Sequence, residues 1–223
     1  MHAAIRAIAV IVKVTAFPVG PLGCNCSIIA DESAKQAIVV DPGGDFDRIK
    51  GVLAEDGLSV RAIVHTHTHI DHVGATAPLQ RWSGAGAHIH EGDRFLYDML
   101  EVQAALLGIQ SVPEKCDLTG ELVDDHRLAF GAFEMRVLHT PGHTPGSCSF
   151  HVESPEGSIV FTGDTLFRRG IGRTDLWGGD SALITRSLKE RLLALDDDTL
   201  VVPGHGSETT IGDERRGNPF LRR

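Results

Sequence analysis

Long hydrophobic runs, zinc-type cysteine pairs and an excess of positive charge are all missing from this 223-residue chain. Because no apolar run reaches the roughly 18 residues that span a bilayer, no membrane partner is expected. The apolar stretch near the N-terminus is short and ends at Lys13 without an A-x-A cleavage site, which favours a cytoplasmic protein over an exported one. The net charge of −9 argues against a nucleic-acid partner, because phosphate binding requires a basic surface.

The four cysteines, Cys24, Cys26, Cys116 and Cys148, include no C-x-x-C pair. They therefore lack the spacing of a structural zinc site. Four cysteines in a chain of this length are also too few for a disulfide scaffold. We expect free thiols, as in a reducing compartment.

Apolar runs of strand type alternate with segments of helical spacing along the chain. No linker or low-complexity segment divides the sequence, so we expect one domain over 1–223, with 1–11 as a candidate disordered leader. The apolar stretch from Asp93 to Pro113 is expected to pack in the core, with a lid or a partner surface as the alternatives. Strands are expected at 12–17, 27–30, 37–40, 60–64, 87–90, 133–138, 147–152, 158–161 and 200–202, and helices at 46–55, 73–82, 93–107 and 181–195.

Two sets of strands with helices outside them are compatible with a four-layer α/β/β/α sandwich. The pattern of strands and helices alone does not select this sandwich over another α+β arrangement.

Histidine is the residue type in excess, with 12 in 223 residues. Four histidines and one aspartate lie within residues 65–72, directly after an apolar strand pattern. Alternate strand positions point to the same side, so His67 and His69 could converge on one point. The turn that follows lets Asp71 and His72 point elsewhere, so the segment could supply two neighbouring metal ions. Imidazole and carboxylate are ligands that zinc, iron and manganese accept.

Three further polar residues follow predicted strands and lie beside glycines. His143 is in a Pro-Gly-His-Thr-Pro-Gly loop, Asp164 follows the strand at 158–161, and His205 follows the strand at 200–202. Glycines allow the backbone to approach a site closely, and strand-end loops commonly carry function. Together with the histidine cluster, these residues indicate a metal centre.

The motif H-x-H-x-D-H followed by a lone histidine, a lone aspartate and a final histidine resembles the metallo-β-lactamase superfamily over nearly the whole chain. The resemblance implies an α/β fold, the four-layer αβ/βα sandwich, with two divalent metal ions. Zinc is the expected metal, with iron or manganese as alternatives. By this resemblance His67, His69 and His143 would bind one metal, Asp71, His72 and His205 the second, and Asp164 would bridge both.

Several short motifs are similar to the short bacterial form of the glyoxalase II-like branch. This resemblance implies a thioester hydrolase that converts S-D-lactoylglutathione to D-lactate and glutathione. A metal-bridging hydroxide would attack the thioester carbonyl, with Asp71 and Asp164 as catalytic residues. The motifs are Asn25-Cys26-Ser27, Asp41-Pro42-Gly43-Gly44, residues 163–167, residues 170–175, Pro203-Gly204-His205-Gly206 and residues 214–220.

One departure affects the substrate. In the long glyoxalase II enzymes a helical C-terminal domain supplies much of the glutathione site, whereas only residues 206–223 follow the last expected ligand here. The glutathione contacts therefore cannot be transferred. Candidate contacts for an acidic, peptide-like substrate are Arg168, Arg169, Arg173 and Trp177, although Arg173 could instead pair with Asp175.

The alternatives have the same fold. The segment 169–175 would suit a persulfide dioxygenase with a mononuclear iron, whereas the loop at 203–206 favours the hydrolase because it retains the second metal site. A lactonase or a promiscuous β-lactamase could use the same dinuclear centre, and the negative charge disfavours a nuclease. The sequence does not indicate an oligomeric state. Outside the ligand pattern, His65 is expected either to support a neighbouring ligand or to be structural. His88, His90, His126, His139 and His151 are expected to be structural or on the surface.

Overall fold

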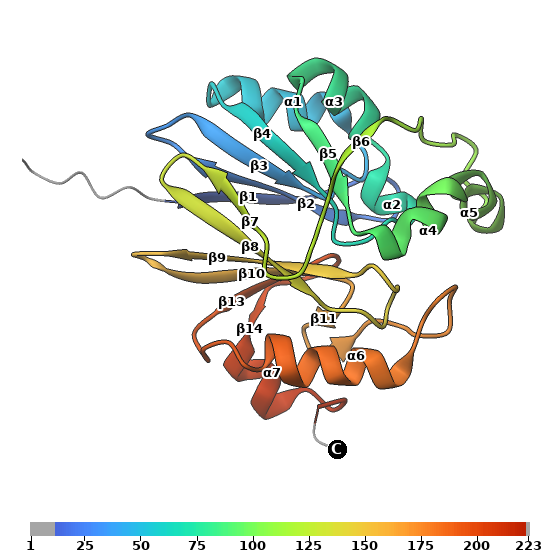
Figure 1. Cartoon of the computed structure of the whole chain (residues 1–223), viewed down its shortest axis with the longest axis vertical. Coiled ribbons are helices and arrows are strands. Elements are labelled where there is room, and N and C mark those ends of the chain that lie inside the picture. The colour runs from blue at the N-terminus through green and yellow to red at the C-terminus, as the bar shows by residue number, and fades with distance from the viewer. Residues whose placement is uncertain (1–11, 222–223) are drawn as a thin grey trace, which may run out of the picture.

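Two six-stranded sheets face each other in the computed structural model, which describes residues 12–221 (Figure 1). The first sheet has the order β1-β2-β3-β4-β5-β6, and the second has the order β14-β13-β10-β9-β8-β7. The strands β11 (Leu166–Phe167) and β12 (Gly170–Ile171) form a separate hairpin. The strands of the two large sheets are β1 (Val12–Val19), β2 (Cys24–Asp31), β3 (Gln36–Val40), β4 (Ser59–Val64), β5 (Gly86–Ile89), β6 (Leu118–Glu121), β7 (Arg127–Phe130), β8 (Phe133–His139), β9 (Cys148–Ser154), β10 (Gly157–Gly163), β13 (Leu200–Pro203) and β14 (Thr209–Thr210).

Helices cover both outer faces and one end of the sandwich (Figure 1). The first sheet is covered by α1 (Phe46–Glu55) and α3 (Thr76–Ser83). The second is covered by α6 (Ser181–Ser187), its continuation η2 (Leu188–Leu192) and α7 (Ile211–Gly217). At the end of the sandwich lie α2 (Ile70–Val73), η1 (Glu91–Asp93), α4 (Arg94–Asp98) and α5 (Leu100–Leu107).

Strand alternation divides the core into separate layers. Ile28 of β2 packs with Ile49 of α1, whereas its neighbour Ile29 packs with Phe150 of β9 between the two sheets. A third cluster joins α6, η2 and α7 to the outer face of the second sheet. Because each sheet buries both faces, the four layers α/β/β/α form one domain, as the resemblance implied.

The layer between the sheets should contribute strongly to stability. Phe150 is fully buried there, and Phe150→Ala is expected to lower the free energy of unfolding by about 3–5 kcal/mol, because it leaves a cavity. Urea unfolding followed by circular dichroism measures the change. Phe220, which is 56% exposed, provides the control Phe220→Ala, expected to change stability by less than about 0.5 kcal/mol. Equal losses in both variants would contradict this assignment of the core.

The structure corrects the expected helix at 93–107. The chain turns at Met99, which has φ −99° and ψ 19°, and this turn separates α4 from α5. Leu100 is buried, but Val102, Leu106 and Leu107 of α5 are exposed. The expectation that this apolar stretch packs in the core was therefore wrong for these residues, because the turn directs them outward.

Other differences concern element boundaries. The helix expected at 73–82 is two helices, α2 and α3, separated at Gly74 and Ala75. The short strands β6, β7 and β14 and helix α7 were not predicted, since they have little apolar periodicity.

The candidate leader at 1–11 lies outside the described residues. Within 12–221 no helix is long and apolar enough to cross a bilayer.

Candidate metal centre

Seven polar side chains converge at one end of the sandwich, where loops of both sheets meet. The loop after β4 carries two histidines, and α2 carries an aspartate and a third histidine. β10 and β13 pair in parallel, so the residues that follow them lie at the same edge of the second sheet. The seven residues are His67, His69, Asp71, His72, His143, Asp164 and His205, which are the seven expected ligands.

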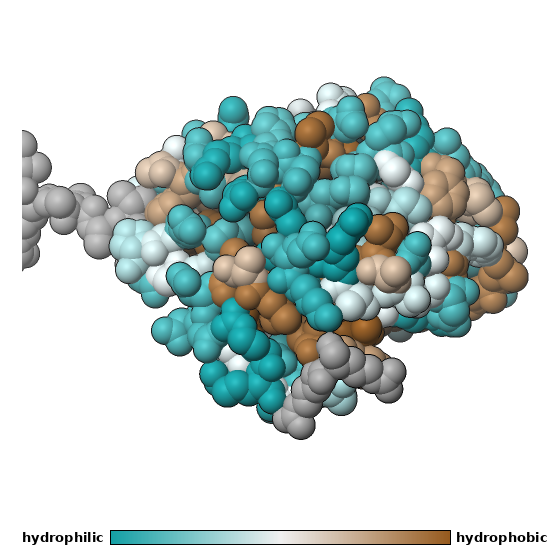
Figure 2. Space-filling model, turned by 60° about the horizontal axis from the view of Figure 1, so that its bottom comes forward, coloured by the Kyte–Doolittle hydropathy of each residue, from teal (hydrophilic) through white to brown (hydrophobic). Residues whose placement is uncertain are grey.

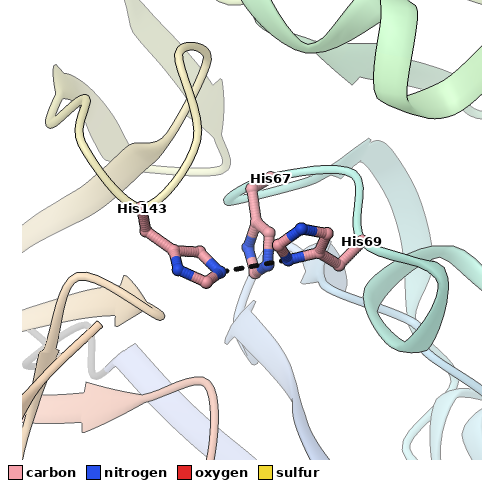
Figure 3. Close-up of side chains that lie close together, drawn as sticks. All are labelled: His67, His69 and His143. Atoms are coloured by element: carbon pink, nitrogen blue, oxygen red, sulfur yellow. Dashed lines mark hydrogen bonds between the residues drawn. The ribbon is translucent and has the colours of Figure 1, made fainter. Parts of the chain in front are cut away.

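The first group consists of His67, His69 and His143. Each offers one ring nitrogen, and these nitrogens lie within 4.8 Å of one another. Figure 3 shows the three rings pointing toward a common point from two loops. Nε2 of His143 lies 3.0 Å from Nδ1 of His69. This arrangement could hold one metal ion.

The second group consists of Asp71, His72 and His205, whose ligand atoms also lie within 4.8 Å of one another. Asp71 Oδ2 is 3.1 Å from Nε2 of His205 and 3.7 Å from Nε2 of His72. Asp164 lies between the two groups. Its Oδ1 is 3.6 Å from His72 Nε2, and its Oδ2 is 3.8 Å from His143 Nε2. A carboxylate in this position could bridge two metal ions.

The close approach of β13 to the centre requires a glycine. A Cβ atom at Gly204 would collide with Oδ1 of Asp164 and Cε1 of His72. The Gly204 carbonyl also accepts a hydrogen bond from the backbone N–H of Asn25, at 2.7 Å. The Asn25 side chain donates to the carbonyls of Pro203 and Gly206, and these contacts hold the loop that carries the last histidine.

Four buried atoms of the centre have no hydrogen-bond partner among the described residues. They are Nε2 of His67, His69 and His72, and Oδ1 of Asp164. A buried polar atom without a partner costs about 1–3 kcal/mol, so native proteins rarely leave several in one place. Cations held by the two groups would satisfy three of these atoms, Nε2 of His67 and His72 and Oδ1 of Asp164, whereas His69 faces the first group with its Nδ1. The imidazole and carboxylate donors present therefore fit divalent metal ions.

The electrostatics of the first group favour neutral rings. Burial lowers the pKa of His67 well below its usual value and that of His69 to about 3. Burial also lowers the pKa of His143. Neutral imidazole is the form that binds a metal, because the protonated ring has no free lone pair.

In the second group, the electrostatics favour charged side chains instead. Burial opposes ionisation of Asp71, but His72 and His205 outweigh it and lower the pKa of this carboxyl group. Burial alone would lower the pKa of His72, but Cys24, Asp71 and Asp41 raise it well above its usual value. The negative charge around His72 is the environment that a cation would neutralise.

Asp41 orients His72, although it was not among the site residues expected from the sequence. Its Oδ2 lies 3.0 Å from Nδ1 of His72 and accepts from the Thr66 hydroxyl at 2.6 Å. Its Oδ1 accepts from the Thr66 backbone N–H at 2.7 Å. Metal-binding histidines commonly hold a carboxylate on the second ring nitrogen in this way. The only signal in the sequence was the motif Asp41-Pro42-Gly43-Gly44.

Asp93 connects the two histidine-bearing loops. This buried carboxylate accepts from the backbone N–H of Thr68 at 3.1 Å, the Thr144 hydroxyl at 2.8 Å and the backbone N–H of Gly146 at 2.6 Å. No sequence pattern identified Asp93. His65 is also buried, and its ring lies within hydrogen-bond distance of the His72 carbonyl and the Thr76 hydroxyl.

The four candidate substrate contacts divide into two pairs. Arg173 and Trp177 line a cavity of about 440 Å³ that opens onto the metal centre. The Arg173 guanidinium forms two hydrogen bonds of 2.8 Å with Asp175, and its carbonyl lies 2.8 Å from Nδ1 of His143. Arg168 and Arg169 do not line this cavity. The Arg169 side chain instead donates to the Asp213 carbonyl.

The fold and this histidine–aspartate centre define a metallo-hydrolase. A family model described as the metallo-beta-lactamase superfamily matches residues 19–205. The chain therefore belongs to the metallo-beta-lactamase superfamily.

Curated relatives within the superfamily have different named activities. The hydroxyacylglutathione hydrolase GloC of Haemophilus influenzae is 40% identical over 217 residues, which cover 95% of this chain and 96% of the relative. The mitochondrial persulfide dioxygenase ETHE1 of Homo sapiens is 30% identical over 212 residues, which cover 90% of this chain and 73% of the relative.

Two solved structures share the fold. BLEG-1, a B3 metallo-beta-lactamase, superposes with a TM-score of 0.86 at 34% identity, covering 95% of this chain and all of the other. TTHA1623 in a di-iron-bound form superposes with a TM-score of 0.82 at 39% identity, covering 93% of this chain and all of the other.

Proposed function

We propose that the chain is a metal-dependent thioester hydrolase that acts on S-D-lactoylglutathione. The observation that carries this proposal is the pair of ligand groups bridged by Asp164, with four buried atoms lacking partners. The 40% identity to GloC supports the choice of thioester over other carbonyl compounds. We also propose a cytoplasmic location, which the four free cysteines support, and no nucleic-acid partner.

Each residue of the centre has a proposed role. His67, His69 and His143 would hold one metal, and Asp71, His72 and His205 would hold the second, with Asp164 shared. When bound, two divalent cations would polarise the thioester carbonyl and lower the pKa of a water molecule toward about 7. Zinc is the proposed metal, with iron and manganese compatible with the same donors.

The chain supplies orientation to the reaction. Asp71 is a proposed ligand, and its carboxylate would also accept a hydrogen bond from the attacking water and so orient it. Asp164 keeps the two ligand groups at a fixed separation. A thiolate leaves readily from a thioester, so the site needs no separate general acid.

The proposal predicts measurable hydrolysis by the metal-loaded chain. Protein expressed in minimal medium should contain about two metals per chain. It should hydrolyse S-D-lactoylglutathione, as followed by loss of thioester absorbance and release of free thiol. Full metal loading without thioester hydrolysis would contradict the proposed substrate class and leave the metal centre standing.

The second candidate is a persulfide dioxygenase with a mononuclear iron, favoured by the 30% identity to ETHE1. The second group, Asp71, His72 and His205, favours the hydrolase because it offers a complete site for another metal. An oxygen electrode separates the two functions, since only the dioxygenase consumes O₂ with a persulfide substrate. Hydrolysis assays with β-lactam and lactone substrates test the remaining alternatives. The likeness to BLEG-1 favours a β-lactam over a lactone.

A further inference from the structure

Five apolar side chains line the cavity at the metal centre. We call this surface the apolar wall, and it consists of Leu22, Leu106, Leu107, Leu176 and Trp177. Leu106 is 66% exposed and Leu107 is 56% exposed. The proposed ligands Asp71 and Asp164 line the same cavity. The apolar wall is therefore continuous with the site of reaction.

Helix α5 carries apolar residues on its exposed side as well as on its buried side. Leu100, Gln103 and Ala104 face the interior, whereas Leu106 and Leu107 remain exposed. Figure 2 shows hydrophobic atoms gathered at the end of the molecule where α5 lies in Figure 1. Contiguous exposed apolar surface commonly marks a binding site.

Gln103 fixes the α5 part of the apolar wall relative to the ligand loop. Its side-chain oxygen accepts from the Ile70 backbone N–H at 2.9 Å. Its side-chain nitrogen donates to the carbonyls of Leu96 at 2.8 Å and Thr68 at 3.3 Å. Because Thr68 and Ile70 flank a proposed ligand, α5 and the two wall residues that it carries, Leu106 and Leu107, are held at a defined position beside the metal centre.

The cavity offers little positive charge to the carrier portion of a thioester. Arg173 is the one Lys or Arg side chain among the described residues that line it, and Asp175 already pairs with this guanidinium. The glutathione portion of a thioester carries two carboxylates. The apolar wall, by contrast, offers a large surface for an uncharged hydrocarbon group.

We infer that the apolar wall binds an apolar acyl chain of the substrate, so that the preferred substrates are medium-chain acyl thioesters. This inference rests on the proposed thioester hydrolysis. The thioester carbonyl would lie at the metal centre, and the chain would extend along Leu106, Leu107 and Trp177. S-D-Lactoylglutathione would then be a small substrate that leaves most of the wall uncovered.

A series of substrates with one thiol and different acyl groups tests the inference. With the metal-loaded chain, kcat/KM is expected to rise about two- to fourfold per added methylene from S-butanoyl- to S-octanoylglutathione. The non-hydrolysable thioethers S-methyl- and S-octylglutathione provide a binding measurement that does not depend on activity. Calorimetry should give at least about tenfold tighter binding of the octyl compound.

Variants of the wall connect the effect to these residues. The double variant Leu106→Gln/Leu107→Gln is expected to flatten the dependence of kcat/KM on chain length and to weaken S-octylglutathione binding about tenfold. Val123→Gln is the matched control, because Val123 is 52% exposed and does not line the cavity. It should retain the chain-length dependence of the unaltered protein.

The possible outcomes are distinguishable. If all the thioesters are hydrolysed at equal rates, or if the octyl and methyl thioethers bind equally, the acyl-chain inference is wrong and the proposed function stands. If the fully loaded chain hydrolyses none of them, the proposed function fails and this inference fails with it. If the double variant changes a dimer to a monomer by light scattering without altering the chain-length dependence, the wall is an interface between copies and the inference is wrong.

Discussion

Asp164→Ala is expected to remove most of the bound metal and to lower kcat/KM for thioester hydrolysis by about a thousandfold or more. The two oxygens of Asp164 face different ligand groups, one toward His72 and the other toward His143. Without this carboxylate, the two ligand groups would face two cations with one negative charge fewer between them. Elemental analysis of the purified variant and a thioester assay measure both effects.

Two comparisons make the result specific to Asp164. Asp198→Ala removes an exposed aspartate elsewhere in the chain and should leave metal content and turnover unaltered. Circular dichroism of the Asp164→Ala protein should show the secondary structure of the unaltered chain, since the sheets do not depend on this side chain. If the variant retains two metals and normal turnover, Asp164 is not a bridging ligand.

The family resemblance supplied the set of expected ligands, and strand positions in the sequence indicated why most of them should lie close together. The cluster at 65–72 comes directly after β4, and Asp164 and His205 follow two strands that pair in parallel. Strand ends bring such residues to one edge of a sheet, so order and spacing along the chain carry spatial information. The arrangement of four layers needed the family resemblance, because apolar alternation shows that a strand is buried without showing what covers it.

The residues that support the site through hydrogen bonds, such as Asp93, were harder to predict from the sequence. Asp93 joins loops through contacts to residues 25 and 51 positions away, and a lone aspartate gives no indication of such contacts.

The motif at 214–220 has a structural explanation. Buried Glu214 accepts from the Arg169 backbone N–H and from the side chains of Thr209 and Asn218. It therefore holds the segment after β11 against α7.

The orientation of α5 could not be predicted for a related reason. Its apolar composition fits either a core helix or a binding surface, and the local turn at Met99 decides between them. The buried Gln103 side chain, which reaches the ligand loop, also has no equivalent signal in a hydropathy pattern. A local turn and a tertiary hydrogen bond thus place α5, and neither has a signal in the hydropathy pattern, although Leu106 and Leu107 are visible in the sequence.

Asp41→Asn is expected to weaken binding of the second metal about 10- to 100-fold while the first group retains its metal. The Asp41 carboxylate accepts from the Thr66 N–H and hydroxyl and lies 3.0 Å from Nδ1 of His72. This contact favours the proton on Nδ1 and leaves Nε2 free for the metal. An asparagine has one acceptor oxygen, so its amide N–H₂ must face either Thr66 or His72, both of which need an acceptor.

A titration with a metal chelator measures this change as release of one metal per chain at a lower chelator concentration than the unaltered protein requires. Asp45→Asn is a matched control, because Asp45 is an exposed aspartate with the same left-handed backbone, φ 50° against 49° for Asp41. Asparagine tolerates that conformation, so a backbone effect would appear in both variants. Weaker metal binding in Asp41→Asn alone would show that a carboxylate outside the ligand set fixes the orientation of His72. Equal metal release from both variants and the unaltered chain would exclude that role.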